Sequence, residues 1–259
     1  MAEYEDIRYE VDDGIATITI DRPDRGNMFR PQTTLDLADA LRRVRDDRTV
    51  RVAILTGAGD RFFCIGGEHD PFEGFDNSVV LPIVDVYELL DTIPKPVIAA
   101  VNGYAVGGGH VLHVMCDLSV ASEKAVFRQV GPMVGSFDAG YGTWYLEDTI
   151  GRKRAKEMWY LNPKISAARA LEIGLVNEVV PPEEVMPRAR ELATDLMKRG
   201  PGALAGLKAA FSSRNHGVLG QARVAHDQLL THYLTTEEAR ELSEAFRERR
   251  DPDQKRFNE

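Results

Sequence analysis

The chain has 259 residues, of which 43% are hydrophobic and 28% are charged. This length allows one large domain, or one domain with an appendage, around a sizeable core. The net charge is −9 and the pI is near 5.3. Because nucleic-acid binding requires a basic surface, this balance argues against nucleic acid as the main partner.

The apolar segments and the cysteines indicate the cellular compartment of the protein. The N-terminal sequence MAEYEDIRYE is acidic and lacks the apolar segment of a signal peptide. The longest apolar run, residues 97–120, is interrupted by polar residues such as Asn102 and Asp117, so we expect no membrane contact. Cys64 and Cys116 lie in apolar sequence and are expected to be reduced core thiols. These features predict a cytoplasmic protein.

The first 56 residues predict a hairpin, a helix and a strand. Residues 7–21 alternate around a turn sequence ending in Gly14 and are expected to form the hairpin. A polar loop follows, and Pro31 opens a helix. Its apolar face is expected to hold one residue per turn: Leu35, Ala38, Leu41 and Val44. Residues 50–56 are dense in Val and Ile and predict a strand.

Two strands are expected to end in glycine turns. The first turn contains Gly66 and Gly67, and the second contains the run 107–109 after the apolar segment that follows Lys95. An adaptable loop over residues 71–80 and a helix over residues 81–91 separate the two. Strands that alternate with helices in this way predict an α/β domain with largely parallel pairing.

The last part of the chain is expected to be mainly helical. Residues 144–161 predict a helix with a break at Gly151, and Ser166 caps a helix that Gly174 ends before the strand-like LVNEVV. Beyond Pro182, periodicity predicts four helices, at residues 182–199, 201–213, 217–233 and 236–249. We expect a core over residues 1–198 and a C-terminal helical region over residues 199–259 that packs on a partner surface.

The two glycine turns are the first candidates for chemistry. A strand that enters a helix through bare backbone leaves N–H groups unpaired at the helix N-terminus. Two such groups aimed at one point would make an oxyanion hole. The alternative is that each is a tight turn packed closely on its sheet.

The motifs GYAVGGGHVLHVMCDLSVAS, FCIGGE and ARALEIGLVNEVVP together resemble the crotonase (enoyl-CoA hydratase/isomerase) superfamily over nearly the whole chain. The resemblance implies a spiral of ββα units with C-terminal helices that hold a trimer or a dimer of trimers, and an acyl-CoA thioester as substrate. It places the thioester oxygen on the backbone N–H groups of Gly67 and Gly108. No tightly bound cofactor and no metal is implied, coenzyme A being part of the substrate.

The residues at the acid-base positions indicate which branch of the superfamily the chain resembles. Where a hydratase of this superfamily carries its two glutamates, this chain has Val111 and Gly131, which cannot accept a proton. The segment FRQVGPMVGSFDAGYG instead resembles the branch of 2-ketocyclohexanecarboxyl-CoA hydrolase and 1,4-dihydroxy-2-naphthoyl-CoA synthase. That resemblance places Ser136 and Asp138 at the reacting carbon. Asp138 could instead cap the helix that follows it, and both roles are compatible.

Within the branch, the pattern is closer to the hydrolase. The synthase's C-terminal catalytic tyrosine falls at Leu234, with Tyr233 one place away. His69 could act as a base, position water or contact the thioester, or be a solvated loop residue. His69, Tyr141 and Tyr233 complete the candidate catalytic set.

The resemblance also assigns contacts to the CoA ester. Arg25 and Arg249 match the phosphate and adenine contacts, and guanidinium groups suit phosphate oxygens, although either arginine could be plain surface charge. Gln129, Val130, Gly131 and Trp159 match a place where one class of the synthase holds bicarbonate, which is not favoured here because Val130 offers no hydroxyl donor. The remaining candidates for ligand contact are Met28, Ile65, Gly66, Glu68, Tyr104, Val106 and Gly107. His110 and His113 have the spacing of a metal pair, but the resemblance makes them packing or hydrogen-bonding residues.

Three functions remain open at this stage. The first is hydrolytic ring opening of a cyclic β-ketoacyl-CoA through an enolate held by the two glycine amides. The second is the intramolecular Claisen cyclisation that forms a dihydroxynaphthoyl-CoA. The third is a catalytically silent subunit that binds CoA esters.

Overall fold

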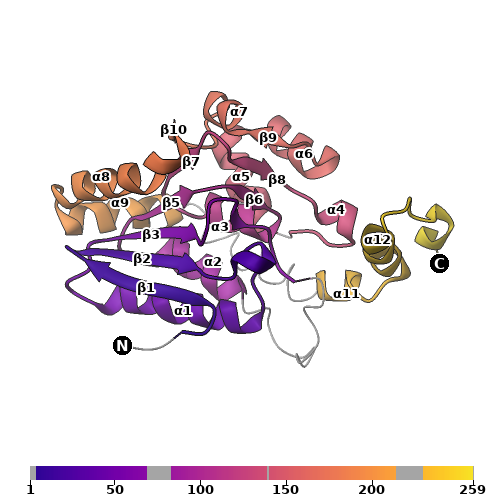
Figure 1. The fold of residues 1–259 in the computed structure, drawn as a ribbon, viewed down its shortest axis with the longest axis horizontal. Helices are drawn as coiled ribbons and strands as arrows, with labels where there is room; N and C mark the ends of the chain where they lie inside the picture. The colour runs from indigo at the N-terminus through magenta and orange to yellow at the C-terminus, as the bar shows by residue number, and fades with distance from the viewer. Residues whose placement is uncertain (1–3, 69–82, 139, 214–229, 259) are drawn as a thin grey trace.

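The computed structural model describes residues 4–68, 83–138, 140–213 and 230–258. Its strands form two sheets, and helices cover them (Figure 1). The six-stranded sheet has the order β1-β2-β3-β5-β7-β10. Its strands are β1 (Ile7–Asp12), β2 (Ile15–Ile20), β3 (Val52–Gly57), β5 (Val97–Val101), β7 (Leu118–Ser122) and β10 (Glu178–Val180). Apart from the antiparallel hairpin β1-β2, all its neighbours pair in parallel, as expected.

The four-stranded sheet has the order β4-β6-β8-β9. Its strands are β4 (Phe62–Cys64), β6 (Tyr104–Val106), β8 (Val126–Arg128) and β9 (Ile165–Ser166). A strand that ends at the first glycine turn was expected, and β4 lies there. Strands β8 and β9 were not expected, because two or three residues cannot show a period of two. One expectation changes with them: the second glycine turn follows β6, and the strand after Lys95 is the separate β5.

The order of elements repeats a unit of two strands and one helix. The helices that close the first four units are α1 (Pro31–Asp46), α2 (Ile83–Thr92), α3 (Gly108–Val114) and α4 (Gly131–Val134). From the second unit on, the first strand joins the six-stranded sheet and the second strand joins the four-stranded sheet. The chain therefore winds as the expected spiral of ββα units.

Burial on both faces explains why the central strands β3 and β5 of the large sheet are mainly apolar. Leu55 and Ala99 face the core shared with α1 and α2, whereas Ile54 and Ile98 face α8 (Val185–Met197). One expectation for α1 is wrong: Leu35 is 55% exposed, and Leu37 and Ala40 are buried instead.

The remaining helices follow the expected pattern. They are α5 (Tyr141–Ile150), α6 (Arg152–Leu161), α7 (Ala167–Glu172), α9 (Pro201–Ser213), α11 (Thr231–Tyr233) and α12 (Glu237–Glu248), with 3-10 turns at Pro23–Arg25, Pro182–Glu184 and Gln254–Asn258. Ser166 caps α7 by accepting a hydrogen bond from the Arg169 amide, as expected. Most of the helix expected at 217–233 lies outside the described residues. No described helix is both long and apolar enough to span a membrane.

Helices α11 and α12 stand apart from the two sheets, beside α4 (Figure 1). Gly135, directly after α4, packs against the backbone of Ala239 in α12 so closely that a Cβ atom at Gly135 would overlap the Ala239 carbonyl. Arg250 and Arg256 donate to the buried Glu241 and tie the end of the chain to α12. The α12 helix is thereby fixed next to α4.

Candidate active site

The two glycine turns meet at one edge of the small sheet. Strands β4 and β6 are parallel neighbours, so the turns that follow them lie at the same edge. A Cβ atom built on Gly66 would lie 3.3 Å from the Gly108 amide nitrogen. Gly66 and Gly107 have φ values of +100° and +54°, which residues with a side chain rarely adopt. Glycine is therefore required at this junction.

Backbone pairing leaves the two candidate amides available. The Phe29 amide donates to the Gly66 carbonyl, and the Glu68 amide donates to the Phe29 carbonyl. In such a parallel bridge the N–H of the residue between them, Gly67, points away from Phe29. Gly108 is the first residue of α3, so its N–H has no acceptor within the helix. Across the described residues, no backbone hydrogen bond outside the helices and strands uses either amide.

The ring of Phe29 leaves no room for a side chain at Gly67 or Gly108. A Cβ atom on Gly67 would lie 3.0 Å from Phe29 Cε2, and one on Gly108 would lie 2.6 Å from Phe29 Cζ. Any side chain at Gly108 would thus displace the ring or the amide. Phe29 was not among the expected site residues, because its contact with both turns arises only in the folded chain.

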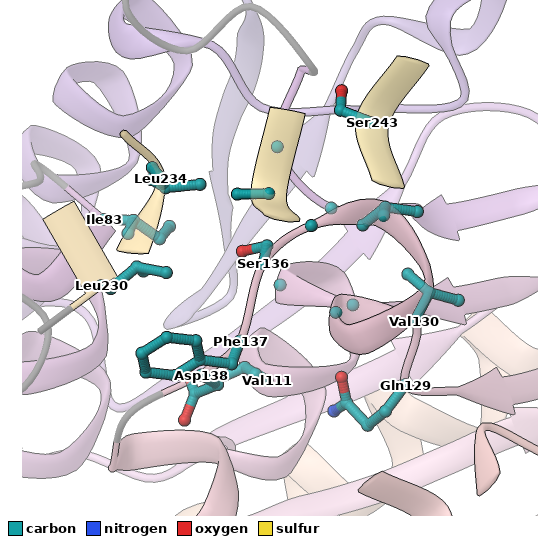
Figure 2. Close-up of a pocket in the computed structure, with 18 of the residues that line it drawn as sticks. Ile83, Val111, Gln129, Val130, Ser136, Phe137, Asp138, Leu230, Leu234 and Ser243 are labelled. Carbon is teal, nitrogen blue, oxygen red and sulfur yellow. The ribbon is translucent and has the colours of Figure 1, made fainter. Parts of the chain in front are cut away.

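Both glycine turns open into a cavity of about 470 Å³. Figure 2 shows residues of its wall that come from α3, α12 and the segments on either side of α4 and of α11. The wall contains eleven of the expected site residues: Ile65, Gly66, Gly67, Glu68, Gly107, Gly108, Gln129, Val130, Gly131, Ser136 and Asp138. Residues far apart in the sequence are therefore brought together as the resemblance implies.

Asp138 both lines the cavity and caps α5. Its Oδ1 atom accepts hydrogen bonds from the amides of Gly142 at 2.7 Å, Gly140 at 3.1 Å and Thr143 at 3.2 Å. A Cβ atom on Gly142 would lie 3.0 Å from Asp138 Cγ and 2.6 Å from Val111 Cγ2. The carboxyl group therefore lies close to Val111, where a hydratase of the superfamily would carry a glutamate. The cap expected as an alternative role is confirmed.

Two carboxylates stand in the described lining, Glu68 and Asp138. Glu68 Oε1 accepts from Arg22 Nη2 at 2.7 Å, and Arg22 Nη1 donates to the Met28 carbonyl at 2.6 Å. Arg22 thus occupies the Glu68 carboxylate, whereas the Asp138 carboxyl group lies beside Val111. Asp138 is therefore the better candidate for proton transfer.

Tyr87 is a wall residue that the sequence did not reveal. It is 2% exposed, and its hydroxyl lies 3.5 Å from the Gly108 carbonyl oxygen. Burial, and next the charge of Asp138, raise the pKa of Tyr87 well above its ordinary value. The hydroxyl stays protonated at neutral pH beside the glycine turn.

The two tyrosines expected in the catalytic set lie outside the cavity wall. Tyr141 is fully buried, and its hydroxyl donates to Glu88 at 2.9 Å. Tyr233 packs edge-to-face on Phe137, and its hydroxyl donates to Glu238 at 3.0 Å. Burial, and next the bond to Glu238, raise the pKa of Tyr233 to about 12.

Five expected ligand contacts also lie outside this wall: Arg25, Met28, Tyr104, Val106 and Arg249. Arg25 and Arg249 are exposed, the first at the end of the 3-10 turn before Gly26 and the second at the end of α12. His69 lies outside the described residues, as does the loop expected at 71–80.

A buried polar chain lies behind Gln129. Its Nε2 atom is 2.7 Å from His110 Nδ1, and the ring of His110 lies beside that of His113, whose Nε2 is 2.9 Å from the Ser119 hydroxyl. The described residues offer no hydrogen-bond partner to Gln129 Oε1 or to Trp159 Nε1, two buried atoms of wall residues. The two histidines thus pack and hydrogen-bond, as expected.

Helix α12 supplies wall residues that were not expected from the sequence: Ala239, Arg240, Ser243 and Arg247. Leu230 and Leu234, the residues directly before and after α11, add an apolar section (Figure 2). The arginines and Ser243 recur at spacings of three and four residues, which places them on one side of α12. This spacing was visible in the sequence, but it is equally typical of a solvated helix face.

Comparison with known proteins agrees with this geometry. Residues 10–256 match the family model described as "Enoyl-CoA hydratase/isomerase". Among solved structures, an enoyl-CoA hydratase from Mycobacterium avium subsp. paratuberculosis K-10 has 28% sequence identity and a TM-score of 0.87, over 97% of this chain and 99% of that one. A carnitinyl-CoA hydratase from Mycobacterium avium has 29% identity and a TM-score of 0.83, over 98% and 99%. An enoyl-CoA hydratase from Bacillus anthracis has 30% identity and a TM-score of 0.76, over 96% and 98%.

The ββα spiral with its paired glycine turns defines a crotonase-type fold. The chain belongs to the enoyl-CoA hydratase/isomerase family and is an acyl-CoA enzyme of the crotonase superfamily.

Proposed function

We propose that the protein opens the ring of a cyclic β-ketoacyl-CoA, such as 2-ketocyclohexanecarboxyl-CoA, by hydrolysis. The observation that carries the proposal is the kind of acid-base group in the cavity. Asp138 provides a carboxylate close to Val111, whereas Val111 and Gly131 occupy the places of a hydratase's glutamates. Simple hydration of an enoyl-CoA is therefore disfavoured, since it would lack both of its usual proton carriers.

The reaction can be written with these groups. Water adds to the ring ketone as Asp138 accepts its proton, and the bond between the ketone carbon and the α-carbon breaks. The electron pair moves into the thioester, whose enolate oxygen receives the N–H groups of Gly67 and Gly108. The former ketone carbon becomes a carboxylic acid, and the α-carbon takes a proton. Ser136, on the same wall, is assigned to hold the attacking water.

The test is to incubate the protein with 2-ketocyclohexanecarboxyl-CoA in ¹⁸O-labelled water. Hydrolytic ring opening yields a seven-carbon dicarboxylic mono-CoA thioester that carries solvent oxygen in its new carboxyl group. In deuterium oxide the product carries at least one deuterium at the α-carbon, because the enolate takes its proton from solvent. Failure to form this product across a panel of cyclic β-ketoacyl-CoA esters would overturn the proposal and favour a non-catalytic CoA-ester-binding subunit.

The cyclisation alternative predicts a different product. Only a synthase would convert o-succinylbenzoyl-CoA into the naphthoyl chromophore, and we expect no such chromophore. Leu234 stands on the wall where the synthase carries its tyrosine, and the Tyr233 hydroxyl is engaged by Glu238. A naphthoyl absorbance would reverse the preference between the two reactions.

We also propose that the chain forms a trimer or a dimer of trimers. Helix α9 packs on α2 with one side, and Lys208 on that side donates to Asp117 at 2.7 Å. Its other side exposes Leu207 and Phe211, at 58% and 76%. Light scattering of the wild type and of Phe211→Ser tests this, with a smaller assembly expected for the variant. A monomeric wild type would contradict it.

A further inference from the structure

Charge divides the cavity wall in two. The carboxylates of the described lining, Glu68 and Asp138, stand near the glycine turns and α3, whereas its guanidinium groups, Arg240 and Arg247, come from α12. The resemblance places the CoA moiety at the Arg25 side, and the neighbouring Gly26 packs against Ile65 beside the first glycine turn. The α12 side lies beyond α4 and is therefore the end toward which an acyl group would extend.

The two arginines of α12 differ in their partners. Arg240 Nη1 lies 2.5 Å from Glu237 Oε1, but both side chains are exposed, at 57% and 36%, and such pairs contribute little and exchange readily. Arg247 makes no ion pair with any described residue. Ser243 lies between them in the sequence, at the spacing of the same side of the helix, and adds a hydroxyl to the cavity wall. The α12 side thus offers one unpaired guanidinium, one exchangeable guanidinium and a hydroxyl.

We infer that Arg247, assisted by Arg240 and Ser243, binds a carboxylate at the far end of the acyl group, so that the ligand of this site is an ω-carboxyacyl-CoA. The inference rests on the proposed ring opening, which converts an uncharged ketone into a carboxylate inside the cavity. That carboxylate is repelled by Glu68 and Asp138 and attracted by the α12 arginines. Guanidinium also suits carboxylate geometrically, with two parallel N–H donors.

The experiment measures binding, so it does not depend on turnover. Calorimetry compares the seven-carbon dicarboxylic mono-CoA thioester with heptanoyl-CoA, which has the same length but no carboxylate. Arg247→Gln is expected to weaken binding of the dicarboxylic thioester about 10-fold and that of heptanoyl-CoA less than about 2-fold, because a charged hydrogen bond is lost only with the former. Arg247→Lys is expected to keep most of the preference. Failure of ring opening would leave this comparison intact, so the two proposals fail separately.

A matched control and a second ligand pair exclude the phosphates of CoA as the partner. Arg152→Gln changes an arginine that is 70% exposed at the start of α6, outside the cavity wall, and is expected to change neither affinity. The pantetheine thioesters of the same two acids lack the nucleotide phosphates. Arg247→Gln is expected to weaken binding of the dicarboxylic pantetheine thioester and to leave that of the heptanoyl thioester nearly unchanged. An equal loss for both CoA thioesters that disappears with the pantetheine thioesters would assign Arg247 to CoA and overturn the inference. No loss with any ligand would overturn it as well.

Discussion

Gly66 and Gly108 approach so closely that a Cβ atom on Gly66 would lie 3.3 Å from the Gly108 amide nitrogen. This contact joins two turns separated by about forty residues of chain, and Gly67 and Gly108 both line one cavity. Phe29 packs against both turns and fixes their spacing. The positions of these two amides therefore depend on backbone packing rather than on any polar side chain.

Gly108→Ala tests that packing. Its Cβ atom would meet Phe29 Cζ at 2.6 Å, so the amide must shift, and kcat should fall by about 10²- to 10³-fold, as for loss of one oxyanion donor. Stability should also fall, by about 1–3 kcal/mol. The control is Gly202→Ala in α9, which has nothing within 4 Å of its Cβ position and should keep full activity. Equal kcat values for the two variants would contradict the assignment.

Asp138→Asn separates the proton-transfer role from the cap. The amide oxygen of asparagine can still accept from the Gly142 and Thr143 amides, so the melting temperature should change little. Turnover should fall by about 10²- to 10⁴-fold, because an amide cannot take a proton from water. Asp138→Ala should lose activity and also about 1 kcal/mol of stability. Full turnover in Asp138→Asn would remove this residue from the mechanism.

The buried histidine pair predicts a pH dependence of stability. Burial lowers the pKa of His113 to about 3 and holds that of His110 well below its ordinary value. Below about pH 6.5 the unfolded chain therefore binds protons that the folded chain does not. The free energy of unfolding thus decreases as the pH is lowered. Between about pH 7 and about pH 5.5 each histidine should cost about 1 kcal/mol of unfolding free energy.

Urea unfolding at the two pH values measures this loss. His113→Asn removes one of the two titrating groups and should reduce the pH-dependent loss by about half, whatever its effect at neutral pH. An unchanged pH dependence in that variant would show that the loss has another origin.

Tyr141→Phe tests whether this tyrosine is structural. The variant removes the hydrogen bond to Glu88 from a fully buried ring, so unfolding free energy should fall by about 1 kcal/mol. Because the hydroxyl lies outside the cavity wall, kcat should stay within about 3-fold of the wild type. A fall of a hundredfold or more would instead return Tyr141 to the catalytic set.

The glycine turns and the position of Asp138 before a helix could be predicted from the sequence because their signals are local. A strand that ends in glycines, and an aspartate before a helix, are visible within a few residues. The contact of Phe29 with both turns, and the position of Tyr87 beside Gly108, depend on packing between distant segments and leave no local pattern. Strands β8 and β9 of the small sheet were missed because two or three residues cannot show the period of a strand.

The C-terminal helix α12 shows a second limit of prediction from the sequence. Arg240, Ser243 and Arg247 occupy one side of α12, and their spacing alone does not tell whether that side meets water or a ligand. Only the packing of Ala239 against Gly135 turns this side toward the cavity. The role of such a helix follows from its tertiary contacts.

The central claim is that two backbone amides hold the thioester oxygen, and infrared difference spectroscopy tests it most directly. A substrate thioester labelled with ¹³C at its carbonyl is bound to Asp138→Asn, which should keep both donors while blocking turnover. The account predicts a carbonyl stretch at clearly lower wavenumber than in water, and a smaller shift when Gly108→Ala is added. A bound carbonyl that absorbs as it does in water, or a shift unaffected by Gly108→Ala, would contradict the account.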